Sequence, residues 1–145
     1  MPLSYLRRAK SSDLEQLVRF LEDNGLTTVG IERWYANFVI ATDEKNTLLG
    51  VAGLEIYGQS ALLRSVAVEK DSRRMGQGRA LIDAVLRNAK QNGVYTVYLL
   101  TERAFDYFKH LGFDLVDRKD IDEAVMASLE FTECHSTALA MRKII

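Results

Sequence analysis

One stretch of the sequence decides the fold: Leu63-Arg64-Ser65-Val66-Ala67-Val68-Glu69-Lys70-Asp71-Ser72-Arg73-Arg74-Met75-Gly76-Gln77-Gly78-Arg79-Ala80-Leu81-Ile82. It begins as an apolar strand, crosses a short polar loop and enters a glycine-containing turn before an amphipathic helix. The first turn of a helix presents unpaired N–H groups and the positive end of the helix dipole. Gly76 and Gly78 leave that backbone open to an approaching phosphate, and Arg73, Arg74 and Arg79 add positive charge. The stretch therefore predicts an anion site, most simply one for a pyrophosphate.

The glycines and arginines of this turn have a second interpretation. A glycine-bearing turn can begin a helix while its arginines are only solvated. The stretch is not a Walker loop, because no Gly-Lys-Ser/Thr follows, and it lacks the third glycine and the later acidic residue of a dinucleotide fingerprint. Glycine spacing alone does not decide between an anion site and a simple turn.

Two separate blocks resemble the GNAT superfamily of acetyltransferases. Arg73-x-x-Gly76-x-Gly78 is similar to its acetyl-CoA motif, Arg/Gln-x-x-Gly-x-Gly/Ala, and Thr101-x-x-Ala104-x-x-x-Phe108-x-x-x-Gly112-Phe113 is similar to a block after its fifth strand. The resemblance implies a GNAT fold, an α/β (α+β) architecture with a mixed, mostly antiparallel sheet of about six to seven strands flanked by helices. More narrowly, the chain resembles small stand-alone GNAT proteins associated with bacterial arsenic-resistance operons. The cues are residues 99–101, 105–113 and 130–138.

The resemblance also implies acetyl-CoA as co-substrate and a small-molecule amine as acceptor, an amino acid or a toxic amine among the candidates. The amine attacks the thioester directly in a ternary complex. The resemblance implies that the backbone of Val66, Ala67 and Val68 pairs with the pantetheine arm and that the amides of residues 75–80 hold the pyrophosphate. The expected cofactor-binding residues are Val66, Ala67, Val68, Arg73, Arg74, Met75, Gly76, Gln77, Gly78, Arg79, Ala80, Thr101, Ala104 and Phe108.

The catalytic residues are less sharply defined. Glu55 and Tyr57 share one face of their expected strand by alternation, and Glu55 is the first choice of general base, ahead of Glu32 and Glu69. A second interpretation of Glu55 is a strand carboxylate held in an ion pair. Phe108 stands where the family has its acid tyrosine, so Tyr107 is the remaining candidate acid, although one step along a helix turns its side chain by about 100°. The absence of that tyrosine is also consistent with a thiolate that leaves without an enzyme acid, and with a module that only binds acyl-CoA.

The periodicity of the remaining sequence predicts the order β-α-(α)-β-β-β-α-β-α-β-(α)-β. Strands are expected at residues 3–8, 37–42, 48–57, 61–68, 96–100, 113–116 and 137–145. Helices are expected after a capping box at Ser12 and Glu15, at residues 78–92 and 103–111, and in shorter form at 30–36 and 121–128.

Composition bounds the remaining questions. The 145 residues suit one N-acetyltransferase domain, residues 1–145, and the formal net charge of -1 gives no reason to expect a nucleic-acid partner. The single cysteine, Cys134, with His110 and His135 makes a metal site unexpected, and Cys134 with His135 makes a poor catalytic pair on an extended segment. We expect a cytoplasmic protein with no membrane partner, monomeric or a homodimer, in which Trp34 and Tyr35 are candidates to line the acceptor pocket.

Overall fold

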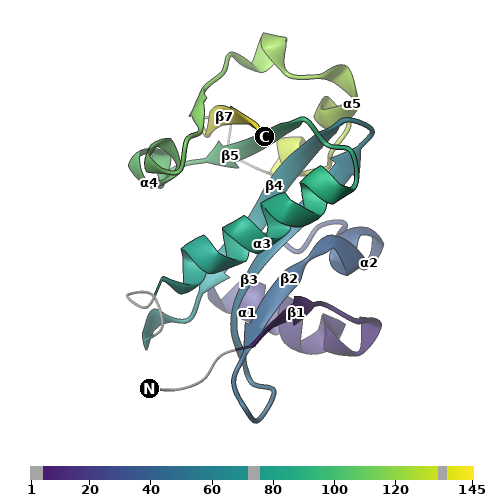
Figure 1. Cartoon of the computed structure of the whole chain (residues 1–145), viewed down its shortest axis with the longest axis vertical. Coiled ribbons are helices and arrows are strands. Elements are labelled where there is room, and N and C mark those ends of the chain that lie inside the picture. The colour runs from purple at the N-terminus through teal and green to yellow at the C-terminus, as the bar shows by residue number, and fades with distance from the viewer. Residues whose placement is uncertain (1–4, 72–75, 134–136) are drawn as a thin grey trace.

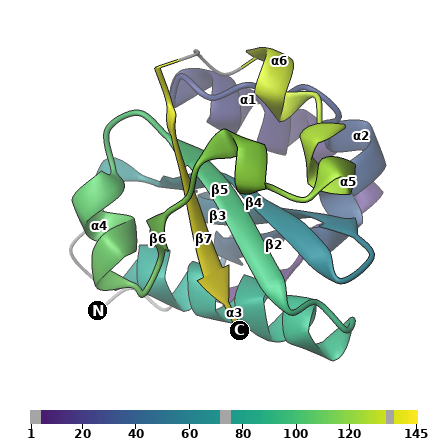
Figure 2. The same cartoon turned by 90° about the horizontal axis from the view of Figure 1, so that it is seen from above.

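The computed structural model describes residues 5–71, 76–133 and 137–145. Seven strands form one sheet in the order β1-β2-β3-β4-β5-β7-β6, with helices on both faces (Figures 1 and 2). Neighbouring strands are antiparallel except β4 and β5, which are parallel. The expected mixed, mostly antiparallel sheet and the expected element order are confirmed. The strands are β1 Tyr5–Arg8, β2 Val39–Thr42, β3 Leu48–Tyr57, β4 Ser60–Val68, β5 Thr96–Thr101, β6 Asp114–Leu115 and β7 Leu139–Ile144.

The two faces of the sheet are covered by different helices. Helices α1 (Leu14–Asp23) and α2 (Ile31–Trp34) lie on one side, and α3 (Gln77–Gln91) crosses the other, as Figure 2 shows. Alternation along β3 assigns each side chain to a side: Val51 packs with the α1 and α2 residues, whereas Ala52 and Leu54 pack under α3. Glu55 therefore points away from α3, toward the face that α1 and α2 cover.

Helix α1 begins differently from the prediction. A 3₁₀ turn, Ser11–Asp13, precedes it, and the backbone N–H of Lys10 donates to Oδ2 of Asp13 over 2.7 Å. Asp13 also accepts from Arg7 at 2.8 and 2.9 Å. The expected capping box at Ser12 and Glu15 is wrong, because the Asp13 carboxylate binds the free end of the turn and a strand arginine together, and so starts the turn two residues earlier.

Three short helices lie near β5 and β7 but do not share one face of the sheet, since Phe108 packs with the residues under α3 and Val125 packs with Tyr98 and Ala140. These are α4 (Phe105–His110), α5 (Glu123–Met126) and α6 (Glu130–Glu133). The first two agree with the expected helical segments, but α6 was not expected. The N–H of Glu130 donates to Oγ of Ser128 over 3.1 Å, a local contact that orders the chain where α6 begins. Among the described residues, no helix is both long and apolar enough to cross a membrane.

Candidate functional site

The site begins where β4 and β5 separate. The two strands pair only at their first residues, through Ser60 with Thr96, Ala61 with Val97 and Leu62 with Tyr98. Beyond these pairs β4 remains paired with β3 and β5 with β7. A cavity of about 600 Å³ opens between the diverging strands, with residues 62–66 on one wall and residues 99–104 on the other. The sheet is therefore split at its centre, and the backbone of β4 forms one wall of the opening.

A bulge in β4 lies at this split. The register passes from Val51–Ala67 to Gly53–Arg64, so β4 carries one more residue than β3 across this interval. Ser65 has φ of 57°, a conformation that non-glycine residues rarely adopt. The extra residue shifts which alternate side chains face each side of the sheet. Leu63, Val66 and Val68 all pack under α3, and Ala67 faces the other side. The bulge thus turns the backbone of residues 65 and 66 at the wall of the cavity, which both of them line.

A second cavity of about 530 Å³ continues from the first toward the start of α3. The two cavities share Asn24, Leu26, Val66, Ala104 and Phe108, so they adjoin, and together they are called the groove. The second is lined further by Ala67, Val68, Gly76, Gly78, Arg79 and Tyr107. Gly76 has φ of 72° and precedes the first turn of α3, and a Cβ at this position would meet no atom within 4 Å. The groove therefore runs from the strand split to an open, positively polarised helix N-terminus.

Most of the residues expected to bind the cofactor lie along this groove. Gln77 and Ala80 belong to the first turn of α3. Thr101 is buried, and its Oγ1 accepts from the N–H of Ala104 over 2.9 Å, which shapes the turn between β5 and α4. Arg73, Arg74 and Met75 lie outside the described residues, as do Cys134 and His135. Of the expected set, the structure brings together Val66, Ala67, Val68, Gly76, Gly78, Arg79, Thr101, Ala104 and Phe108.

Two of the aromatic residues of α4, Tyr107 and Phe108, occupy different places. Phe108 is buried, and its ring meets that of Phe113 edge to face, with 5.8 Å between the ring centroids. It lines both cavities with carbon atoms only. Tyr107 lines only the second cavity, where its hydroxyl lies 3.0 Å from the position that a Cβ on Gly78 would take. Burial raises the pKa of Tyr107, so its hydroxyl is protonated near neutral pH and available as a donor beside the start of α3.

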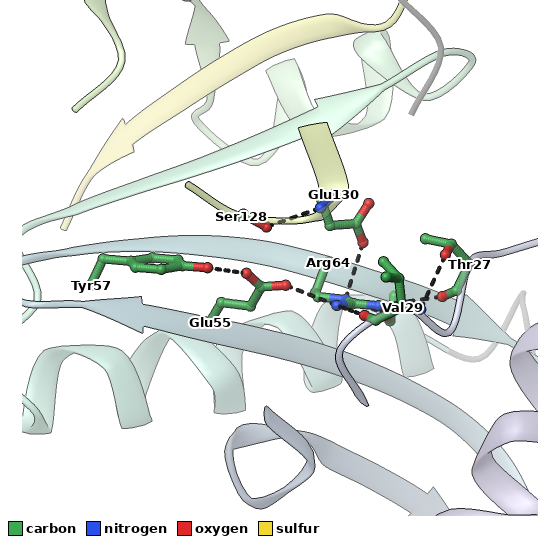
Figure 3. A network of polar contacts seen from close by, with 8 residues as sticks. Thr27, Val29, Glu55, Tyr57, Arg64, Ser128 and Glu130 are labelled. Carbon is green, nitrogen blue, oxygen red and sulfur yellow. Dashed lines mark hydrogen bonds and ion pairs between the residues drawn. The ribbon is translucent and has the colours of Figure 1, made fainter. Parts of the chain in front are cut away.

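A network of polar contacts lies beside the first cavity (Figure 3). Glu55 accepts from the Tyr57 hydroxyl at 2.5 Å and from Nη1 of Arg64 at 2.8 Å, which confirms that Glu55 and Tyr57 share a face. The Arg64 Nε lies 3.0 Å from Oε1 of Glu130 on α6. The side chains of Glu55 and Arg64 are 2% and 1% exposed. Glu55 is thus a buried, ion-paired carboxylate.

Arg64 also donates hydrogen bonds to the backbone of the loop between α1 and α2. Its Nη1 donates to the carbonyl of Val29 over 2.6 Å and its Nη2 to the carbonyl of Thr27 over 3.3 Å. Nε lies 3.0 Å from Oγ of Ser65 at the bulge. One guanidinium therefore joins β3, β4, the segment before α2 and the start of α6. Burial, with the hydrogen bond to Glu55, raises the pKa of Tyr57 to about 12, so this phenol stays protonated and acts as a donor in the network.

Sequence reasoning missed Arg64 and Glu130. A signal for Arg64 was present, since a lone charged residue within the apolar run of β4 must find buried partners. Glu130 had no such signal, because its helix is four residues long. The other candidate bases, Glu32 and Glu69, line neither cavity. Trp34 and Tyr35, the candidates for the acceptor pocket, also line neither cavity, and the ring of Trp34 contacts that of Tyr57 at a tilt of 56°, with 5.4 Å between the centroids. In the described part of the chain, no group of three or more His, Cys, Asp or Glu residues could hold a metal ion.

Comparison with known proteins agrees with this geometry. The model of the Acetyltransferase (GNAT) family matches residues 7–113. The amino-acid acetyltransferase of Pasteurella multocida (strain Pm70) is 28% identical over 127 residues, which cover 81% of this chain and 29% of that protein. The amino-acid acetyltransferase of Escherichia coli (strain K12) is 29% identical over 121 residues, 77% of this chain and 27% of that protein. The chain thus spans less than a third of the length of these two relatives.

Solved structures share the fold. An N-acetylglutamate synthase from Neisseria gonorrhoeae, complexed with coenzyme A and N-acetyl-glutamate, superposes with a TM-score of 0.83 at 18% identity, covering 99% of this chain and 35% of that chain. A Mycobacterium tuberculosis protein in complex with CoA and NLQ gives a TM-score of 0.79 at 18% identity, with 97% and 99% covered. At these identities the similarity establishes the architecture alone.

Proposed function

Because the chain belongs to the GNAT acetyltransferase family, we propose that it is an acetyl-CoA-dependent N-acetyltransferase acting on the primary amine of a small molecule. The observation that carries the proposal is the separation of β4 from β5 at the Ser65 bulge, with a groove that leads from there to the start of α3. Such a groove offers an extended backbone for an extended ligand arm and a helix N-terminus for its phosphates.

Each end of the groove suits one part of acetyl-CoA. The backbone of Val66, Ala67 and Val68 lines the second cavity as a strand that a pantetheine arm can extend. The amides at the start of α3 suit the pyrophosphate, with Arg79 beside them. Arg73, Arg74 and Met75 belong to the proposed site on the sequence motif alone. Phe108 and Ala104 lie between the two cavities and provide apolar contact. We expect one N–H group of Val66, Ala67 or Val68 to polarise the thioester carbonyl and so to stabilise the developing oxyanion.

The acceptor side of the groove is the first cavity, beside the Arg64 network. Its walls come from residues 24–27 after α1, from the β5–α4 turn and from Glu130. The cavity is the right size for a small amine, since ligand sites span about 300–1,000 Å³. The amino-acid acetyltransferase relatives direct the search for the acceptor to amino acids first, and then to toxic amines. The assignment to the arsenic-resistance subfamily rests on sequence cues alone and stays part of this proposal.

A transfer assay tests the proposed function. The full chain is incubated with acetyl-CoA and a panel of primary amines, beginning with the proteinogenic amino acids, while loss of the thioester is followed spectroscopically. Acetylation of one or more amines, confirmed by the mass of the product, supports the proposal. Tight binding of acetyl-CoA with no transfer across the panel would instead support an acyl-CoA-binding module. That second function is favoured by Phe108, which cannot donate a proton to the leaving thiolate.

Further parts of the proposal concern the whole protein. We propose one N-acetyltransferase domain over residues 1–145, cytoplasmic, monomeric or homodimeric, with no nucleic-acid or membrane partner. The mass of the particle in solution, measured by light scattering during size-exclusion chromatography, distinguishes the monomer from the dimer.

A further inference from the structure

Two carboxylates contact the one guanidinium at the acceptor side of the groove, within the part of the chain that the structure describes. Arg64 reaches Glu55 through Nη1 at 2.8 Å and Glu130 through Nε at 3.0 Å. The exposed fraction of the Glu130 side chain is 9% and that of Glu55 is 2%. These three groups bring two negative charges against one positive charge into a poorly solvated place, which favours the arrival of a cation.

Only one of the two carboxylates borders the cavity. Glu130 lines the first cavity, whereas Glu55 is absent from the walls of both. The two oxygens of Glu55 already accept from Tyr57 and from Arg64. In Figure 3 the two carboxylates approach the guanidinium from different sides, Glu55 from β3 and Glu130 from α6. A ligand that enters the first cavity therefore meets Glu130 and not Glu55.

Glu130 also lies beside the atoms that would hold the acetyl group. The Nε of Arg64 that contacts Glu130 lies 3.0 Å from Oγ of Ser65, the residue whose positive φ forms the bulge. Ser65, Val66 and Glu130 line the same cavity. If the thioester carbonyl rests on the bulge backbone, as the proposed function requires, Glu130 lies on the side from which the amine approaches.

We propose that Glu130 binds the acceptor ammonium and accepts its proton, and that Glu55 acts only as a positioning residue through Arg64. This inference rests on the proposed function, which it deepens by assigning the general base. One proton passes from the ammonium to a Glu130 oxygen. The nitrogen lone pair then forms the N–C bond, and the C–S bond breaks with its electron pair remaining on sulfur. The second proton lost by nitrogen neutralises the thiolate, and Glu130 returns its proton to water.

Several charged and titratable groups surround Glu130 and set its environment. Arg64 faces it from β4, and Glu55 and Tyr57 lie across the guanidinium on β3. Glu102 and Arg103 line the same cavity from the turn after β5, at more exposed positions. Because a protonated carboxyl can neither hold an ammonium nor take a proton, kcat/KM should fall as the pH is lowered, and this acidic limb should belong to Glu130.

The test compares Glu130→Gln, Glu130→Asp and Glu55→Gln with Glu22→Gln, an exposed position on α1. With the acceptor that reacts best, kcat/KM of Glu130→Gln should be about 10²–10⁴-fold lower than that of the wild type and should no longer fall at acidic pH. Its affinity for acetyl-CoA should stay unchanged. Glu130→Asp should be faster than Glu130→Gln, and its kcat/KM should again fall at acidic pH. Glu55→Gln should keep the limb even if its rate falls, and Glu22→Gln should match the wild type. Acetyl-CoA affinity also verifies that each variant is folded.

A second readout separates this inference from the proposed function. Methylammonium is titrated into the protein–CoA complex, a mixture that cannot react. Its dissociation constant should rise at least about tenfold in Glu130→Gln and not in Glu22→Gln. If the wild type transfers acetyl to no amine but binds methylammonium in a way that depends on Glu130, the proposed function is wrong and the amine-binding site at Glu130 is supported. Equal methylammonium binding by wild type and Glu130→Gln would overturn the inference. So would a fall of kcat/KM at acidic pH that Glu55→Gln removes and Glu130→Gln retains.

Discussion

Nη1 of Arg64 donates to Oε2 of Glu55 over 2.8 Å, and both side chains are almost completely excluded from solvent. The pair joins β3 to β4 directly beside the bulge, and Arg64 carries the contacts onward to Thr27, Val29 and Glu130 (Figure 3). A buried ion pair owes its persistence to complete pairing, because either charge alone would be costly to bury. Arg64 is therefore the residue on which the arrangement of the acceptor side depends.

Replacement of Arg64 should destabilise the protein strongly. Arg64→Met leaves two buried carboxylates without their guanidinium and should lower the free energy of unfolding by about 3–5 kcal/mol. Arg64→Lys, which keeps the charge but not the planar set of donors, should fall between Arg64→Met and the wild type. Urea unfolding followed by circular dichroism at pH 7 measures the differences.

The matched control is Arg19→Met, which removes an exposed arginine 4.0 Å from Glu15 on the surface of α1. An exposed pair of this kind contributes about 0.5 kcal/mol or less. If Arg64→Met proved as stable as Arg19→Met, the network would contribute nothing to the fold, and its role in holding the acceptor side would have to be abandoned.

Tyr107→Phe tests the remaining candidate for the general acid. The Tyr107 hydroxyl lies beside Gly78 at the start of α3, in the cavity that we assign to the phosphates and pantetheine arm of acetyl-CoA. We therefore expect Tyr107→Phe to weaken acetyl-CoA binding by less than about tenfold, the effect of one hydrogen bond, and to leave kcat within about twofold. Steady-state kinetics and calorimetric titration measure both quantities. A loss of about 100-fold in kcat at unchanged acetyl-CoA affinity would instead identify Tyr107 as the acid.

Asp13 should make the stability of the protein depend on acidic pH. The hydrogen bond from Arg7 holds the pKa of Asp13 below its usual value, so the stabilisation is present above the unfolded pKa and is lost as the pH falls through the lower, folded one. Asp13→Asn should cost about 0.5–2 kcal/mol at pH 7, the range for loss of a helix cap. The difference between wild type and variant should shrink below about pH 4.

Thermal unfolding from pH 7 to pH 2 checks this expectation. The carboxylate of Asp43 is the comparison. Its pKa is also lowered, chiefly by a backbone hydrogen bond from Thr47, whereas its turn is exposed. A destabilisation by Asp13→Asn that stayed constant across the whole range would contradict the linkage.

The extent to which the sequence predicts this structure varies from element to element. The apolar run Leu48–Tyr57, bounded by polar turns, predicts β3 to the residue, as expected for a strand that is buried on both faces. The site at Gly76 and Gly78 could be found as well, since strand, turn and helix lie close together in sequence. The start of α1 could not, because the choice between Ser12 and Asp13 was made by Arg7 on a separate strand.

Glu130 shows the same limit at the candidate site. It meets Arg64 across 66 positions of sequence, from a helix of four residues with no periodic pattern. Contacts of this kind depend on the path of the whole chain between Thr101 and Leu139, which local propensity does not determine. The strand carboxylate Glu55 stood out in sequence as the base, whereas Glu130 reaches the cavity wall only through the packing of α6.

The groove that begins at the β4 bulge should end in a phosphate site at the start of α3. Gly76→Asp and Gly93→Asp form a matched pair to test it: the two glycines stand at opposite ends of α3 with φ of 72° and 81°, and a Cβ added to either would meet no atom within 4 Å. Both variants place a side chain at a similar positive φ and add one negative charge. Only Gly76 lines the groove, where a carboxylate would repel a pyrophosphate.

Calorimetric titration of acetyl-CoA into wild type, Gly76→Asp and Gly93→Asp is the most direct measurement. We expect equal affinity for wild type and Gly93→Asp, and a loss of more than about 100-fold for a folded Gly76→Asp, since opposing like charges cost several kcal/mol. Wild-type affinity in Gly76→Asp, or no binding by wild type, would rule out the phosphate site at the start of α3.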